Sequence, residues 1–181
     1  MSKKNKSPFT EIDYNSGEGM MTSIWGPPMW HILHTISFNY PINPDEKQKK
    51  YYYEFYKNIK NILPCKYCRD NLLNNLKKHK LTKSIMKNRT TLSKWVYELH
   101  EIVNTMLGKK SGLSYEKVRD RYEHFRSRCL VDPNNKGIQI KESGCVEPLH
   151  GIKSKCVINI IPKDELSPSF IMDPKCIIKK K

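Results

Sequence analysis

Two cysteines three positions apart, Cys65 and Cys68, are the residues of this sequence with the clearest chemistry. Pro64 precedes them, and because helices end at or before the residue preceding a proline, the pair lies where a new helix can begin. Free backbone amides and the helix dipole at such a start favour a thiolate, and lower a thiol pKa from about 8.5 to roughly 3.5–7.5. Lys66 and Arg69 add positive charge nearby. The pair is therefore predicted to be a redox-active disulfide.

Two other interpretations of the cysteine pair stay open at this point. It could be half of a zinc site, but such sites need four ligands, and the nearest further candidate, His79, has no fourth partner nearby in the sequence. It could also be two unrelated buried thiols.

A second group of residues suits a planar cofactor. Trp30 and His34 are four positions apart and share one helix face, and His100 and Asn104 do the same further along the chain. Each of them alone is typical of core packing. Together they offer rings for stacking and polar atoms for ring heteroatoms, a common lining for a small-molecule site. We therefore expect a redox cofactor beside the cysteine pair.

The elements that position these residues are helical. Apolar residues recur every three or four positions in the segments 30–38, 51–62, 65–76, 92–106 and 118–125. Asn43 is predicted to cap the second helix with Pro44 at its first position, Gly108 to end the long fourth helix, and Ser114 to precede a short fifth one. The predicted fold is all-α, a four-helix bundle with a short fifth helix.

Residue composition and apolar periodicity divide the chain into three predicted parts. They are a flexible tail at 1–22, the helical domain at 23–128, and a cysteine-containing extension at 129–181. The extension has turn residues and short candidate strands at 138–140 and 156–161, which predicts a small irregular or β structure. Its cysteines could form a shuttle disulfide, a structural disulfide such as Cys145–Cys156, or a zinc site with His150. Sequence alone does not choose among the pairings of Cys129, Cys145, Cys156 and Cys176.

Charge and hydropathy restrict the compartment and the partners. Lys and Arg number 33 against 18 Asp and Glu, a net charge of +15, but 27 of the 33 cations are Lys and they are scattered. Specific readers of nucleic acid depend on arginine, so we expect no physiological nucleic-acid partner. The sequence has neither an apolar run long enough for a membrane helix nor the pattern of a signal peptide, which predicts a protein without membrane association made in a cytosol-like compartment.

Several short motifs occur in a fixed order between about Gly26 and Tyr122. In chain order they are Trp30-x-x-x-His34-Thr35, Tyr40-Pro41, Pro64-Cys65-x-x-Cys68, Trp95, His100-x-x-Val103-Asn104, Leu107-Gly108-Lys109 and Arg121-Tyr122. With this order and spacing the chain resembles the Erv/ALR family of FAD-linked sulfhydryl oxidases. The lack of a signal-peptide pattern and the predicted cytosol-like compartment are typical of the branch of that family carried by large DNA viruses.

The resemblance implies an activity and a set of partners. Dithiols of client proteins, or of a thioredoxin-like relay protein, would be oxidised to disulfides, and electrons would pass through FAD to oxygen, giving hydrogen peroxide. It implies a homodimer, with Cys65 as the exposed interchange cysteine and Cys68 as the flavin-proximal one. The residues implied to contact FAD are Trp30, His34, Tyr40, Tyr97, His100, Val103, Asn104, Lys109, Arg121 and Tyr122.

The sequence departs from this family at one structural disulfide. The family usually has a cysteine two residues after the tryptophan of the long helix, bridged to one at the start of the last helix, whereas this chain has Tyr97 and Tyr115 there. Packing of the two tyrosines is predicted to replace the bridge.

The resemblance also bears on location. The viral branch predicts the host cytoplasm or the virion, and the mitochondrial intermembrane space is the alternative. The alternative function is a non-enzymatic basic module that binds zinc or nucleic acid.

Overall fold

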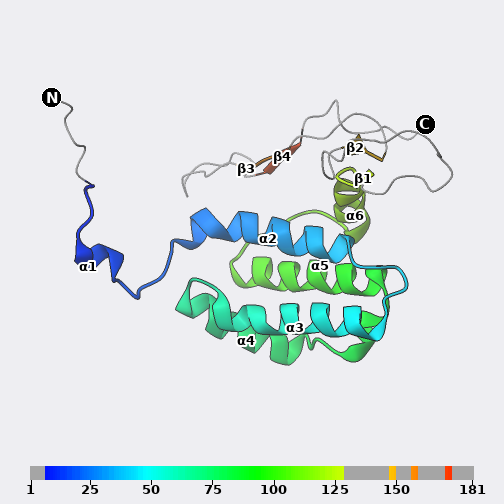
Figure 1. Cartoon of the computed structure of the whole chain (residues 1–181), viewed down its shortest axis with the longest axis horizontal. Helices are drawn as coiled ribbons and strands as arrows, with labels where there is room; N and C mark the ends of the chain where they lie inside the picture. The colour runs from blue at the N-terminus through cyan, green and yellow to red at the C-terminus, as the bar shows by residue number, and fades with distance from the viewer. Residues whose placement is uncertain (1–6, 129–146, 150–155, 159–169, 173–181) are drawn as a thin grey trace, which may run out of the picture.

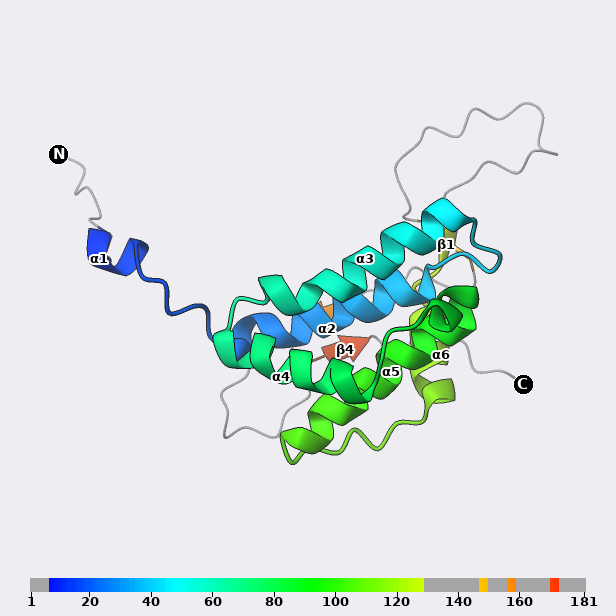
Figure 2. The ribbon, with the colours of Figure 1, turned by 90° about the horizontal axis from the view of Figure 1, so that it is seen from below.

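The computed structural model describes residues 7–128, 147–149, 156–158 and 170–172. Four helices form a bundle, and a shorter helix lies across one end of it (Figure 1, Figure 2). A short helix and a 3-10 helix are added before and within the bundle. The helices are α1 (Glu11–Tyr14), α2 (Thr22–Phe38), α3 (Glu46–Ile62), α4 (Lys66–Lys78), η1 (Lys83–Lys87), α5 (Arg89–Met106) and α6 (Tyr115–Glu123). The predicted fold class is confirmed.

Local capping explains where the long helices begin. Asp45 caps α3, since its carboxylate accepts the backbone N–H of Gln48 at 2.7 Å and the Gln48 side chain accepts the Asp45 N–H at 2.9 Å. The prediction that Asn43 caps this helix is therefore wrong, because the reciprocal pair places the start two residues later. Asn88 caps α5 in the same way, accepting the Thr91 N–H at 3.0 Å.

The core lies between α2, α3 and α5. Trp95, Leu92 and Val96 of α5 are almost wholly buried, and they pack with Leu33 of α2 and Tyr56 of α3. The Tyr56 hydroxyl donates to the Leu33 carbonyl at 2.8 Å, which satisfies a buried polar atom and fixes α3 against α2. This packing holds α2 and α5 in the positions from which both supply side chains to the site.

Residues 19–22, here called the N-terminal arm, lie against the start of α4. The Met20 N–H donates to the Pro64 carbonyl at 2.8 Å, and the Trp25 indole donates to the Met20 carbonyl at 3.0 Å. Gly19 has φ +92°, and a Cβ there would lie 2.6 Å from the Pro64 oxygen, so only glycine fits this close approach. This part of the predicted flexible tail is thus packed beside the cysteine pair.

The end helix α6 is fixed to α5 by two tyrosines. Their rings lie 5.9 Å apart between centroids, so the predicted contact of Tyr97 with Tyr115 is confirmed. The Tyr97 hydroxyl donates to the Leu113 carbonyl at 2.8 Å, and the Tyr115 hydroxyl lies 2.8 Å from Ser93 Oγ. Gly108 follows the end of α5 with φ +68°, as a C-terminal glycine should.

Beyond α6 the described part contains two short antiparallel ribbons. They are β1 (Ser127–Arg128) with β2 (Glu147–Pro148), and β3 (Cys156–Ile158) with β4 (Phe170–Met172). The predicted strand at 156–161 is confirmed over its first three residues. The strand predicted at 138–140, together with Cys129, Cys145 and Cys176, lies outside the described residues. Of the helices described, none has the length and apolar character needed to cross a bilayer.

Candidate functional site

The cysteine pair lies at the first turn of α4. Cys65 is the N-cap residue of this helix, and its sulfur accepts the backbone N–H of Cys68 at 3.3 Å. Arg69 donates to the Leu63 carbonyl, which ties the first turn of α4 to the chain before it. Both cysteines are free thiols in the structure, and both are partly exposed. The pair is therefore reachable by another thiol.

The two sulfurs differ in how readily they ionise. The thiol of Cys68, and to a lesser degree its backbone N–H, stabilise negative charge on Cys65 and lower the Cys65 pKa. Burial raises the pKa of Cys68, and the hydrogen bond to Cys65 raises it further. The expectation of a stabilised thiolate at this helix start therefore applies to Cys65 and not to Cys68.

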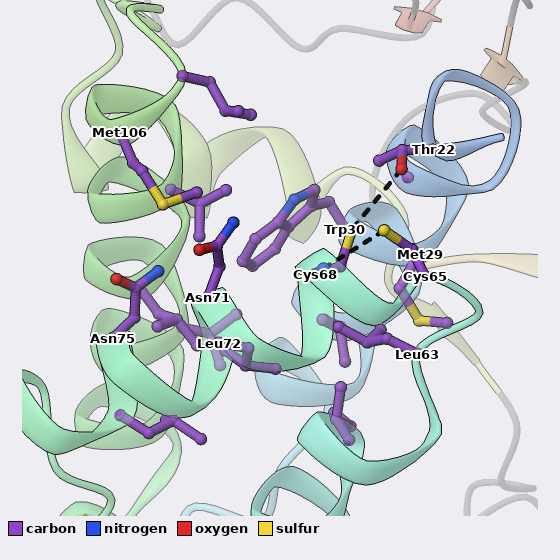
Figure 3. A pocket seen from close by; sticks show the side chains of 18 of the residues that line it. Thr22, Met29, Trp30, Leu63, Cys65, Cys68, Asn71, Leu72, Asn75 and Met106 are labelled. Carbon is purple, nitrogen blue, oxygen red and sulfur yellow. Dashed lines mark hydrogen bonds between the residues drawn. The ribbon is translucent and has the colours of Figure 1, made fainter. Parts of the chain in front are cut away.

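Thr22, at the end of the N-terminal arm, is the polar neighbour of Cys68. Its Oγ1 lies 3.6 Å from Cys68 Sγ, within hydrogen-bond distance for sulfur (Figure 3). This contact and the charge of Arg69 both act to lower the Cys68 pKa, against the effect of burial. The arm therefore brings to the inner sulfur a hydroxyl that α4 itself does not supply.

An apolar cavity of about 420 Å³ opens beside the two sulfurs. In Figure 3 it extends from the cysteines past Trp30 toward Met106 of α5, with α4 as one wall. Its lining is aliphatic and aromatic, with Asn71 and Asn75 of α4 among the few polar side chains. A volume of this size lies in the range of about 300–1,000 Å³ typical of small-molecule sites.

A second cavity, of about 570 Å³, adjoins the first between α2, α5 and α6. Trp30 lines both cavities, and its ring stacks on that of His100 with centroids 4.0 Å apart and planes 5° apart. The second cavity carries the cations Lys109 and Arg121. It therefore combines aromatic rings with positive charge, whereas the first cavity is apolar and ends at the dithiol.

His34 and His100, here called the histidine pair, line the second cavity. His34 Nε2 lies 3.0 Å from His100 Nδ1. Burial lowers the pKa of His34 to about 3 and that of His100 to about 4, so both rings are neutral near pH 7 and one donates to the other. Nδ1 of His34 is buried without a hydrogen-bond partner in the described structure. Such an atom usually has a partner, which here a ligand could supply.

The structure brings most of the residues predicted for the site together. The second cavity is lined by Trp30, His34, Tyr97, His100, Val103, Asn104, Lys109, Arg121 and Tyr122. Tyr40 is different: it is fully buried, its hydroxyl donates to the Met86 carbonyl at 2.9 Å, and it lines neither cavity. The turn after α2 places Tyr40 in the core, and its contact with FAD stays a prediction.

Sequence reasoning missed part of the lining. Thr22 lies in the segment predicted to be a tail, and Asn75 belongs to none of the sequence motifs. The spacing of Asn75 does indicate its position, because it follows Leu72 by three residues. This spacing places the Asn75 amide on the apolar face of α4. Across the described ranges, no group of three His, Cys, Asp or Glu side chains is placed to hold a metal ion.

Comparisons with known proteins agree in pointing to one family. The sequence profile of the Erv1 / Alr family matches residues 27–123. A protein of Acanthamoeba polyphaga mimivirus named "Probable FAD-linked sulfhydryl oxidase" is 37% identical over 99 residues, which are 55% of this chain and 68% of that protein. The FAD-linked sulfhydryl oxidase of African swine fever virus is 30% identical over 99 residues, 55% of this chain and 80% of that protein.

Relatives outside the viruses and a solved structure complete the comparison. The mitochondrial FAD-linked sulfhydryl oxidase erv1 of Schizosaccharomyces pombe is 31% identical over 84 residues, 46% of each chain. The crystal structure of the FAD binding domain of Erv1 from Saccharomyces cerevisiae superimposes with a TM-score of 0.52 at 24% identity, over 57% of this chain and 94% of that one. At this identity the likeness to the yeast structure speaks for the fold.

Proposed function

This chain belongs to the Erv1/Alr family, and on that premise we propose that it is an FAD-linked sulfhydryl oxidase whose dithiol is Cys65 and Cys68. The observation that carries the proposal is that both cysteines line the apolar cavity that adjoins the aromatic and cationic one. A redox pair and a two-part cofactor cavity therefore meet in one bundle.

The residues of the two cavities fit FAD. A flavin ring is planar and largely apolar, which suits the apolar cavity beside the sulfurs. The diphosphate is anionic and adenine is aromatic, which suits Lys109, Arg121 and the rings of the second cavity. The unpartnered Nδ1 of His34 is a polar atom that such a ligand can satisfy. The residues proposed to hold FAD are Trp30, His34, Tyr97, His100, Val103, Asn104, Lys109, Arg121 and Tyr122.

The chain's own part in the reaction begins at Cys65. In the oxidised enzyme a thiolate of the substrate attacks Cys65 Sγ, a new disulfide forms between substrate and Cys65, and the Cys65–Cys68 bond breaks with its electron pair on Cys68. A second substrate thiolate attacks the mixed disulfide, so the substrate leaves oxidised and Cys65 leaves as a thiolate. The low Cys65 pKa favours this departure, because a more acidic thiol leaves faster.

The sulfur of Cys68 needs groups that stabilise its negative charge. Cys68 takes negative charge when the internal disulfide opens, although burial opposes that charge. The Thr22 hydroxyl and the Arg69 guanidinium are placed to stabilise it. When FAD is bound, it supplies the two-electron acceptor that returns the dithiol to a disulfide and passes the electrons to oxygen, giving hydrogen peroxide.

Purified full-length protein tests this function directly. We expect bound FAD that is released on denaturation, oxygen uptake with dithiothreitol, and hydrogen peroxide as product. Cys68→Ser should retain FAD and lose oxygen uptake, and Cys65→Ser should lose turnover as well. A colourless protein, or oxygen uptake that survives Cys68→Ser, would contradict the proposal.

Partners and location are proposed more broadly. The substrates are thiols, and we take them to be client proteins or a thioredoxin-like relay protein, with a homodimer as the working form. Residues 23–128 are proposed to be the oxidase unit, in accord with the family match over 27–123. We propose the host cytoplasm or the virion as its location, with the mitochondrial intermembrane space as the alternative. Cell fractionation would separate these locations.

A further inference from the structure

Three buried side-chain polar atoms of the described residues lack a hydrogen-bond partner: His34 Nδ1, Trp95 Nε1 and Asn75 Nδ2. All three residues line one of the two cavities. A buried polar atom without a hydrogen-bond partner has lost its contact with water and gained nothing in exchange, so native proteins contain few of them. Their gathering around the cavities indicates that a bound ligand, rather than the protein, completes their hydrogen bonds.

Asn75 is the member of this set that no motif of the sequence marks. It is the buried residue of α4, with 8% of its surface exposed. Its neighbours in the α4 wall of the cavity include Leu72 and Leu76, so the Asn75 amide borders aliphatic side chains. An amide kept there without a partner is a cost that leucine would avoid.

The position of Asn75 relates it to the redox pair. It follows Cys68 by seven residues on the same helix, which is two turns or about 10 Å along the axis. Figure 3 shows Asn71 one turn before it, with both amides directed from α4 toward α5 and Met106. The apolar cavity therefore has sulfur at one end of the α4 wall and an amide at the other.

We propose that Asn75 is a cofactor-binding residue whose amide donates a hydrogen bond to an acceptor atom of the flavin ring in the apolar cavity. This inference rests on the proposed function, since it takes FAD as the ligand. The isoalloxazine ring carries carbonyl oxygens and ring nitrogens that accept hydrogen bonds, and the aliphatic part of the lining offers them none. In the flavin-free protein the same amide is a local source of instability.

This proposal predicts opposite effects of one substitution on two measurements. Asn75→Leu has a similar volume and removes the unpaired donor, so the melting temperature of the full-length protein stripped of flavin should rise. The dissociation constant for FAD, measured by titrating that protein and following flavin fluorescence, should increase about five- to tenfold, which corresponds to about 1–1.4 kcal/mol. If Asn75 had only a structural role, Asn75→Leu would lower both the melting temperature and the affinity for FAD.

Asn74→Leu is the matched control, because Asn74 is the adjacent, exposed residue of the same helix. It should leave the dissociation constant for FAD unchanged. Asn75→Asp keeps the shape but removes the donor, and near pH 7 it should bind FAD at least as weakly as Asn75→Leu. An Asn75→Leu affinity within twofold of the wild type, a fall in its flavin-free melting temperature, or tight binding by Asn75→Asp would overturn the inference. A wild-type protein that binds no FAD would instead overturn the proposed function.

Discussion

The contact of Tyr97 with Tyr115 makes a specific prediction about stability. Tyr97→Phe removes one hydrogen bond, from its hydroxyl to the Leu113 carbonyl. Because Leu113 is only half-buried, water can partly replace that donor, and the expected loss of unfolding free energy is about 1 kcal/mol. Ser93 donates its own hydrogen to the Arg89 carbonyl at 2.8 Å, so in the other bond the donor is Tyr115. Tyr115→Phe should therefore cost a similar or smaller amount.

The double variant should lose about 2 kcal/mol, measured by urea unfolding of the full-length protein. For a domain of this size each kcal/mol lowers the melting temperature by roughly 3–6 °C. Because α6 carries Arg121 and Tyr122 into the second cavity, the double variant should also bind FAD more weakly.

Tyr51→Phe serves as the control, since Tyr51 is an exposed tyrosine of α3. It should change stability by less than about 0.5 kcal/mol. The loss of unfolding free energy caused by Tyr97→Phe should be the same with and without dithiothreitol, because the contact of Tyr97 with Tyr115 contains no sulfur. If Tyr97→Phe were as stable as Tyr51→Phe, the tyrosine contact would not be what holds α6 in place.

Three further predictions concern the arm and the histidine pair. Thr22→Val should raise the pKa of Cys68 and slow the alkylation of Cys68 near pH 7 several-fold, whereas Thr22→Ser should leave the alkylation rate near that of the wild type. Peptide mapping measures the alkylation of Cys68, and equal rates in the two variants would refute the contact. Gly19→Ala should lose roughly 1–3 kcal/mol of unfolding free energy, because Gly19 has positive φ and a Cβ there would collide with the Pro64 carbonyl. Gly17→Ala, at a site with open space, should lose almost none, and similar losses in the two variants would contradict this explanation. The rings of the histidine pair have a pKa of about 6.5 when unfolded, and folded values of about 3 for His34 and about 4 for His100. Stability should therefore fall as the pH drops below 6.5, down to about pH 4 for His100 and about pH 3 for His34, by up to about 1.4 kcal/mol per pH unit for each ring. The variant His100→Gln should show a shallower fall in urea titrations, and an unchanged slope would count against a neutral pair.

The helices and most of the candidate site followed from local patterns. Apolar residues spaced three and four positions apart predicted every helix of the bundle. The short last helix does follow Ser114, whose side chain caps α6 by accepting the Lys117 N–H. The start of α3 was misplaced because the deciding bond joins Asp45 to Gln48, whereas Asn-Pro is only a general start signal. Capping there depends on the side chain three residues later.

The rest of the site depends on three-dimensional placement. Tyr40 belongs to a motif, but its location depends on the direction of the turn after α2, which spacing does not encode. Thr22 reaches Cys68 from 46 residues away, through a contact that local patterns do not reveal. Asn75 was hidden because three leucines nearby make its helix face look like an ordinary core stripe.

The anchoring of the arm on Pro64 also sets what a tethered substrate would experience. Residues 7–18 lead directly into Gly19, so they would act as a short linker between the N-terminal arm and a cysteine peptide fused before them. This linker would keep the peptide's cysteine near Cys65. Short flexible linkers give effective concentrations on the order of millimolar, far above that of a dilute free peptide. An otherwise weak thiol substrate fused there would react as an intramolecular partner, at a rate independent of how dilute the solution is.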